Sequence, residues 1–380
     1  MERRRGHAIA AAEAIYLARA VELAARAIAD AAPNPPVGAV FVRDGRTLGE
    51  GYHHRLGEAH AEVEALRAAH HAGFDVRDAT VYVSLEPCDH HGRTPPCTQA
   101  LIASGVARVV IGALDPNPKT AGGGVARLQA AGIHVEVVSD PAALALVERF
   151  AFTITSGQPF VTLKMAMSLD GAVAPRPGPF WLTGELAQER VRELRFEHAA
   201  VMVGAGTIRI DDPQLTLRPH RVRHKPYARV IVCETDTVPP MSRVFSAPAD
   251  APPDAYRKTI VLAPAGVRER FSALEDRAEV VYVGSADARE LDLHAALLAL
   301  RACGIATVLC EGGPTLAGRF LERGLVQRVV WIIAPRFIRT ESAIPVLTGA
   351  DLTKVANGWH FDRVERWGDD LMVTARIDHV

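Results

Sequence analysis

Short apolar runs alternate with longer amphipathic segments along the first 140 residues of the chain. The runs have the length of about four to eight residues that is typical of buried strands, and the longer segments place apolar side chains at helical spacing. This alternation predicts a layered α/β domain with a largely parallel sheet. Strands are expected at 37–42, 47–52, 80–85, 107–114 and 134–138, and helices at 8–31, 58–72, 95–104 and 123–132.

A helix at 141–154 is followed by the sequence SGQP at 156–159, which interrupts the periodic pattern. We predict a domain boundary there, which divides the 380 residues into domains at 1–155 and 156–380. The second half again alternates and predicts a second α/β domain. Strands are expected at 160–168, 199–206, 228–233, 259–264, 280–284, 306–313, 327–335 and 371–377, and helices at 185–198, 288–302 and from Pro314. Residues 236–256 hold five prolines and are expected to form a surface loop.

The charge balance argues against several classes of protein. A net charge of −1 leaves no broad basic surface for neutralising phosphates, so a nucleic-acid partner is not expected. The N-terminal helix is interrupted by Glu13, Arg19 and Glu22, so it does not resemble a signal peptide. No run of about 20 apolar residues occurs, so a membrane span is not expected.

Five cysteines at irregular spacing do not form the pattern of a disulfide framework. Reduced thiols of this kind indicate a cytoplasmic protein. Cys233, Cys303 and Cys310 lie in apolar runs and are interpreted as small buried residues. Cys88 and Cys97 lie in the polar segment PCDHHGRTPPC and require a different explanation.

The sequence HAE at 60–62 and the two cysteines of PCDHHGRTPPC provide the ligands of a zinc site. A catalytic zinc takes three protein ligands and keeps one position open, and His60, Cys88 and Cys97 supply one nitrogen and two sulfurs. Both segments are expected to open helices, whose N-termini favour thiolates. Taken singly, HAE is more often structural, and two cysteines nine residues apart can also form a structural zinc pair or pack in a core. The combination predicts one catalytic zinc per chain.

Glu62 follows His60 by two residues, a spacing that lets it point into the site without binding the metal. Zinc lowers the pKa of a bound water to about 7. A carboxylate beside it can take a proton from this water and pass it to a leaving amine. We therefore predict that Glu62 is the general acid–base of a hydrolytic deaminase.

The zinc-deaminase signature is H-x-E followed by P-C-x-x-C, and here eight residues separate the cysteines instead of two. This long loop resembles that of the bifunctional deaminase/reductase family of riboflavin biosynthesis. The resemblance extends over nearly the whole chain and is carried in the first half by NPPVGAV (34–40), HAEVEAL (60–66), SLEPCDHHGRTPPC (84–97) and ALDPNPKTAGGG (113–124). It implies a cytidine-deaminase-like three-layer αβα domain.

The same resemblance implies a substrate, 2,5-diamino-6-(5-phosphoribosylamino)pyrimidin-4-one, which loses its ring amine. Asn34 is then a candidate contact to the pyrimidine, and an Asn-Pro turn is the other interpretation. His90, His91 and Arg93 lie between the cysteines and can touch the substrate or remain solvated loop side chains.

The second half resembles the reductase part of the family, which has the fold of dihydrofolate reductase and uses NADPH to reduce the ribosyl group to ribityl. The motifs are FVTLKMAMSLDGAVA (160–174), FWLTG (180–184), AVMVGAGTIRIDDPQLTLR (200–218) and CEGGPTLAGRFL (310–321). The resemblance implies a catalytic role for Asp211 beside the cofactor. It further implies cofactor contacts at Ala166, Trp181, Thr207, Asp211, Gly313, Pro314, Thr315 and Leu316, and substrate contacts at Lys164, Arg195, Leu215, Arg218 and Glu311.

The second half also departs from the family pattern. Pro179 stands in the segment PRPGPF where a polar side chain is usual, Cys233-Glu234 where an aspartate is usual, and 336–343 where a glycine-rich turn is usual. These departures keep open a deaminase with a non-catalytic C-terminal scaffold domain. A nucleoside or RNA-base deaminase is a further alternative, against which the neutral charge and few aromatics argue. A small phosphorylated pyrimidine is the expected partner, and a homo-oligomer is possible.

Overall fold

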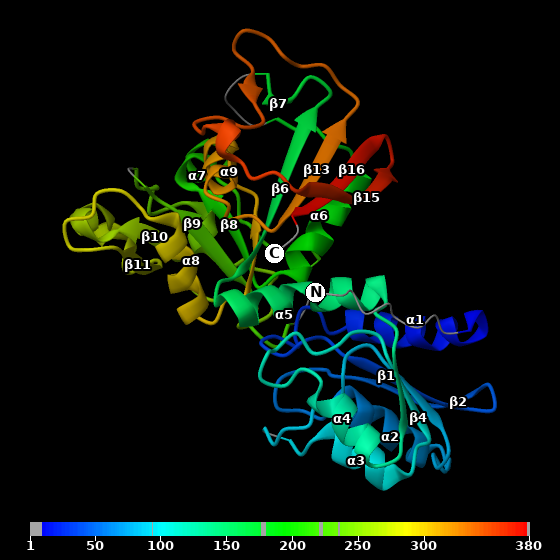
Figure 1. Ribbon diagram of the computed structural model, residues 1–380. Coiled ribbons are helices and arrows are strands. Elements are labelled where there is room, and N and C mark those ends of the chain that lie inside the picture. The colour runs from blue at the N-terminus through cyan, green and yellow to red at the C-terminus, as the bar shows by residue number, and fades with distance from the viewer. Residues whose placement is uncertain (1–9, 93, 176–179, 220–222, 235, 378–380) are drawn as a thin grey trace. The chain divides into compact units, whose positions relative to one another are not determined.

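The computed structural model describes residues 10–92, 94–175, 180–219, 223–234 and 236–377. Its chain divides into two compact units, Met1–Gly157 and Gln158–Val380 (Figure 1). Each unit contains its own sheet and its own buried cores. No helix in the described ranges is long and apolar enough to cross a membrane.

The first unit is built on a five-stranded sheet with the order β2-β1-β3-β4-β5. Strands β3, β4 and β5 are parallel, whereas β1 runs antiparallel to both β2 and β3. Strands β2 to β5 therefore share one direction, and the sheet is largely parallel as predicted. Strand β1 is the exception, and the positive φ angles of Asp44-Gly45 turn it directly back into β2. The elements are α1 (Ala11–Ala25), β1 (Gly38–Arg43), β2 (Arg46–Tyr52), α2 (Ala61–His71), β3 (Thr80–Val83), α3 (Cys97–Ser104), β4 (Arg108–Ile111), α4 (Gly123–Ala130), β5 (His134–Val137) and α5 (Pro141–Ser156).

Successive strand residues of this sheet enter opposite cores, as the two-residue period of a strand requires. Phe41 packs with α2, α3 and α4 on one face, whereas its neighbours Val40 and Val42 pack with α1 on the other. Helix α5 joins α1 on that second face through Ala143 and Val147. The result is a three-layer αβα unit (Figure 1).

The second unit holds a nine-stranded sheet with the order β11-β10-β9-β8-β12-β6-β13-β16-β15. The strands from β11 to β13 are parallel, and the β15–β16 hairpin adds an antiparallel edge. The strands are β6 (Phe160–Ser168), β7 (Ala172–Ala174), β8 (Ala200–Gly204), β9 (Ala228–Val232), β10 (Ile260–Pro264), β11 (Glu279–Val283), β12 (Thr307–Cys310), β13 (Arg328–Ala334), β14 (Ile344–Pro345), β15 (Trp359–Trp367) and β16 (Asp370–Ile377). The helices are α6 (Glu185–Glu197), α7 (Ala205–Asp211), α8 (Leu293–Ala302) and α9 (Pro314–Glu322), with short 3₁₀ segments at Arg243–Phe245, Ala265–Leu274 and Leu352–Lys354.

Apolar side chains of the second sheet again alternate between its two faces. Met202 packs with α8 and α9, whereas Val201 packs with α7 and the 3₁₀ segment Ala265–Leu274. Helix α6 covers part of the sheet near β13 and β16 through Ala187 and Leu194. The carboxyl ends of β6, β8 and β12 lead into the segments that hold the motifs of the second half.

Candidate active sites

Three segments of the first unit converge on one point. His60 is the N-cap residue of α2, Cys97 is the first residue of α3, and Cys88 lies in the segment that follows β3. Nδ1 of His60 lies 3.2 Å from Sγ of Cys97 and 3.5 Å from Sγ of Cys88. The three ligand atoms all lie within 4.8 Å of one another, and one nitrogen with two sulfurs is a donor set that suits zinc. The structure thus brings the three predicted ligands together.

The groups around this cluster favour metal binding by fixing its charge and orientation. Oγ1 of Thr94 lies 3.3 Å from Nε2 of His60 and can accept a hydrogen bond from it. In that tautomer the lone pair of Nδ1 faces the two sulfurs. The thiol of Cys97 donates toward Cys88, and this bond, together with one from the Cys97 amide, lowers the pKa of Cys88 against the opposing effect of burial. These bonds favour the thiolate form of Cys88, which is the form that binds a metal.

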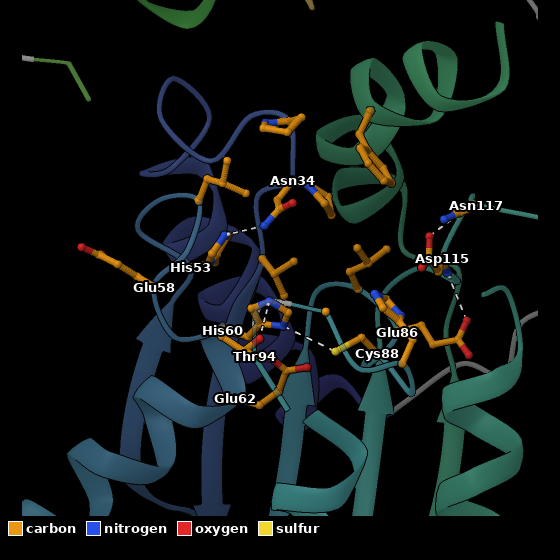
Figure 2. Close-up of a pocket in the computed structure, with 18 of the residues that line it drawn as sticks. Asn34, His53, Glu58, His60, Glu62, Glu86, Cys88, Thr94, Asp115 and Asn117 are labelled. Carbon is orange, nitrogen blue, oxygen red and sulfur yellow. Dashed lines mark hydrogen bonds between the residues drawn. The ribbon is translucent and has the colours of Figure 1, made fainter. Parts of the chain in front are cut away.

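Glu62 lies in the first turn of α2 and is 3% exposed. Burial, together with the negative charge of Cys88, raises the pKa of Glu62 to about 6. Figure 2 shows its carboxylate below the ring of His60, on the side of Cys88. This arrangement places a proton acceptor next to the cluster but outside the set of three ligands.

The cluster lies at the bottom of a pocket of about 460 Å³. Asn34 lines it, as predicted, and its side chain contacts His53, which the sequence interpretation missed. Asp115 and Asn117 line the opposite wall (Figure 2). The polar segment ALDPNPKTAGGG pointed to this wall, whereas the doublet His53-His54 after a predicted strand was the available signal for His53. Apolar side chains complete the lining, among them Leu56, Leu85, Phe150 and Ile154.

The loop between the two cysteines contributes unequally to this pocket. His90 and Thr94 line it, whereas His91 is exposed and does not belong to the lining. Arg93 lies outside the described residues. Asp89 accepts a hydrogen bond from Thr98 at 2.5 Å, which fastens the loop to α3.

A second pocket, of about 530 Å³, lies in the second unit. It opens at the N-terminus of α9, where Gly313 is the N-cap residue and Pro314 occupies the first turn without a side-chain cap. Asp211 ends α7 at the same pocket, and burial raises its pKa. The predicted reductase residues in the lining are Lys164, Ala166, Trp181, Thr207, Asp211, Glu311, Gly313, Pro314, Thr315 and Leu316.

An ion pair between Arg195 and Glu311 lies at this second pocket. Nε of Arg195 donates to Oε1 of Glu311 at 2.6 Å, and Nη1 donates to the carbonyl of Thr216. Burial opposes ionisation of Glu311, but the neighbouring Arg195 holds its pKa below the usual range. Burial lowers the pKa of Lys164, although Glu311 partly counters this effect. Arg195 itself is not part of the pocket lining; it contacts Glu311, which is part of it.

Two other predicted substrate residues lie outside this lining. Leu215 is 4% exposed and packs in the core with α7. Arg218 donates to Thr216 and Gln214 on its own segment. Substrate contacts for these two residues stay predictions.

Two of the three positions at which the sequence departs from the family pattern have defined contacts in the structure. Cys233 is buried and Glu234 pairs with Arg319 of α9. Asp170 accepts from the amides of Ile338 and Arg339, which fixes the turn at 336–343. Pro179 lies outside the described residues. Of the three cysteines expected to be buried, Cys233 and Cys310 are, whereas Cys303 is only half-buried because it ends α8 at the surface.

Comparisons with known proteins extend over both units. Residues 12–113 match the cytidine and deoxycytidylate deaminase zinc-binding region, and residues 159–373 match the RibD C-terminal domain. The riboflavin biosynthesis protein RibD of Escherichia coli is 36% identical over 373 residues, which cover 94% of this chain and 97% of that protein. The RibD protein of Aquifex aeolicus is 37% identical over 360 residues, covering 94% and 96%. The chain belongs to the RibD family.

Solved RibD structures have the same architecture. The diaminohydroxyphosphoribosylaminopyrimidine deaminase/5-amino-6-(5-phosphoribosylamino)uracil reductase of Thermotoga maritima is 33% identical, with a TM-score of 0.82 over 97% of this chain and 99% of that one. Acinetobacter baumannii RibD is 31% identical, with a TM-score of 0.78 over 97% and 99%. The predicted fold is thereby confirmed, a cytidine deaminase domain followed by a RibD reductase domain of the dihydrofolate reductase type. As a RibD protein, the chain is a bifunctional deaminase and reductase of riboflavin biosynthesis.

Proposed function

We propose that residues 1–155 deaminate 2,5-diamino-6-(5-phosphoribosylamino)pyrimidin-4-one and that residues 156–380 then reduce the ribosyl group of the product to ribityl with NADPH. The observation that carries the first step is the convergence of His60, Cys88 and Cys97 at a pocket whose lining includes His60, Cys88 and the buried Glu62. The match of residues 159–373 to the RibD C-terminal domain supports the second step.

In the deaminase, His60 through Nδ1 and the sulfurs of Cys88 and Cys97 would hold zinc. Zinc, when bound, makes water nucleophilic near neutral pH. Glu62 takes a proton from the attacking water and gives it to the departing amine, so that the ring carbon gains a carbonyl and ammonia leaves. Asn34 and Asn117 on opposite walls orient the pyrimidine through amide hydrogen bonds.

In the reductase, the N-terminus of α9 would hold the pyrophosphate of the cofactor, because backbone amides at a helix start attract anions. NADPH, when bound, supplies the hydride that protein side chains cannot. Asp211 borders the same pocket, where burial raises its pKa, and it is placed to pass a proton to the substrate. Lys164 and Glu311 provide polar contacts to the ribosyl group.

The test is to mix the purified chain with the pyrimidine substrate, with and without NADPH. Ammonia should be released in both mixtures, whereas absorbance of the nicotinamide should fall only after deamination has supplied the second substrate. Ammonia release without any consumption of NADPH would show the second unit to be a scaffold. If Asp211→Asn oxidises NADPH as fast as the parent chain, the second unit is a reductase but Asp211 is not its proton donor.

A further inference from the structure

Glu86 is a buried carboxylate of the first unit that is neither one of the three metal ligands nor the proton-transfer residue Glu62. It lies between the end of β3 and Cys88, and it is 6% exposed. Within the described part of the chain, no lysine or arginine pairs with it. A charged group this well buried is stable only when several donors surround it.

The donors are three backbone amides of one segment. Oε2 of Glu86 accepts from the amide of Asp115 at 3.1 Å and from that of Gly122 at 3.0 Å. Oε1 accepts from the amide of Val125 at 3.1 Å. Gly122 is the N-cap residue of α4 and has no side chain to cap it, so Glu86 caps this helix from another segment.

The same segment also packs closely on the backbone next to the metal ligand. A Cβ at Gly124 would lie 2.0 Å from the carbonyl oxygen of Pro87, the residue between Glu86 and Cys88. Glycine is therefore required there for the start of α4 to touch this backbone. The capping bonds and the close approach together fasten 115–125 to the segment that presents Cys88.

What is fastened in this way is one wall of the substrate pocket. Oδ1 of Asp115 accepts from the amide of Asn117 at 2.9 Å, and Oδ2 accepts from the hydroxyl of Thr120 at 2.6 Å. Asp115 and Asn117 both line the pocket. Figure 2 shows the dashed path from Glu86 to Asp115 and on to Asn117, with Cys88 between this wall and His60.

We propose that Glu86 is a positioning residue of the deaminase, which sets the place of the Asp115–Asn117 wall relative to the Cys88 segment. It touches no reacting atom and acts through the backbone of 115–125. The inference rests on the proposed deamination, because its consequence is correct placement of the pyrimidine. Its loss should therefore weaken substrate binding more than it slows the chemical step.

The experiment compares Glu86→Gln with the parent chain in amide hydrogen exchange, steady-state kinetics, zinc content and NADPH consumption. Glutamine replaces one accepting oxygen by an NH₂ group that faces an amide donor, so the bonds to 115–125 weaken. We expect amide hydrogen exchange across 115–125 to accelerate about tenfold and KM for the pyrimidine to rise about tenfold, with kcat changed less than threefold or so. Zinc content and the NADPH reaction should stay at the parent values.

Glu136→Gln is the matched control, because it removes a half-buried carboxylate from β5 of the same unit, where its partners are Arg108 and His134. It should leave exchange in 115–125 and KM unchanged. Glu86→Asp keeps the charge but shortens the side chain, and it should have an intermediate effect.

Parent values of exchange and KM in a folded, zinc-loaded Glu86→Gln would overturn the proposal. Loss of zinc from that variant would also overturn the proposal, because Glu86 would then hold the segment of Cys88 in place and would not position the Asp115–Asn117 wall. If neither Glu86 variant folds, Glu86 supports the fold and has no separate positioning role. Faster exchange in a chain whose parent releases no ammonia would refute the deaminase function and leave the wall contact standing.

Discussion

The amide nitrogen of Asn34 lies 3.0 Å from Nε2 of His53, and this contact fixes the orientation of both side chains. Nδ1 of His53 lies 3.1 Å from the carbonyl oxygen of Ala59, which can only accept, so Nδ1 carries the proton. Burial lowers the pKa of His53, so the ring is neutral and Nε2 must accept from the Asn34 amide. The oxygen of Asn34 is thereby left to accept a hydrogen bond from a ligand in the pocket.

This relationship predicts that His53 acts on the substrate through Asn34. Asn34→Ala should raise KM for the pyrimidine about tenfold, because one hydrogen bond to the substrate is lost. His53→Ala should raise it less, and adding His53→Ala to Asn34→Ala should have almost no further effect. Steady-state kinetics of the double-mutant cycle measure this, with His54→Ala as the control. Strictly additive effects would mean that His53 contacts the substrate on its own.

Removal of one ligand should empty the metal site. Cys88→Ser replaces a thiolate by a hydroxyl that binds zinc weakly, so the purified variant should retain far less than the one zinc per chain expected of the parent. Metal analysis of both proteins measures the change. Cys303→Ser, at a cysteine far along the sequence in the other unit, should keep its zinc. Full zinc content in Cys88→Ser would refute the ligand assignment.

Glu62 should be essential for deamination and dispensable for metal binding. Glu62→Gln keeps the size of the side chain but cannot take up a proton, so the rate of ammonia release should fall about 10²–10⁴-fold. Zinc content should not change, and neither should NADPH consumption assayed with the deaminated pyrimidine. A near-normal rate of deamination in this variant would show that another group moves the proton.

The stability of the second unit should depend on pH through Glu311. Arg195 holds the pKa of Glu311 below its unfolded value of about 4.3, so the stabilisation is complete above that pH and is lost as the pH falls through the folded pKa. The Arg195 and Glu311 side chains are 21% and 11% exposed, and Glu311→Gln leaves the half-buried guanidinium without its charged partner, which should cost about 3 kcal/mol. Thermal unfolding between about pH 7 and pH 3 should show the difference from the parent chain shrinking at the acidic end. A difference that is constant with pH would exclude this contribution.

Much of the first site could be predicted because its residues follow local rules. His60 and Cys97 lie at helix starts, where hydrophobic periodicity and turn residues define the position from neighbouring sequence alone. Cys88 follows a buried strand, whose apolar run is equally visible. Strand β6 was likewise expected at 160–168, as the structure has it.

Contacts between loops could not be predicted in this way. His53 meets Asn34 across 19 residues, and Glu86 reaches Val125 across 39, through backbone turns that no periodic pattern encodes. The direction of β1 was missed because a period of two residues defines a strand but not its orientation. Strand β15 was missed because it forms an exposed edge, and a register shift between Phe361 and Arg363 interrupts the alternation of its apolar residues.

Helix α5 has a consequence for anyone who wishes to express the deaminase alone. The deaminase family match ends at residue 113, yet Phe150 and Ile154 of α5 form part of the pocket lining. A fragment cut near residue 113 would retain all three metal ligands and Glu62 but would leave the pocket open on that side. An excised deaminase must therefore continue to Gly157, where the first unit ends.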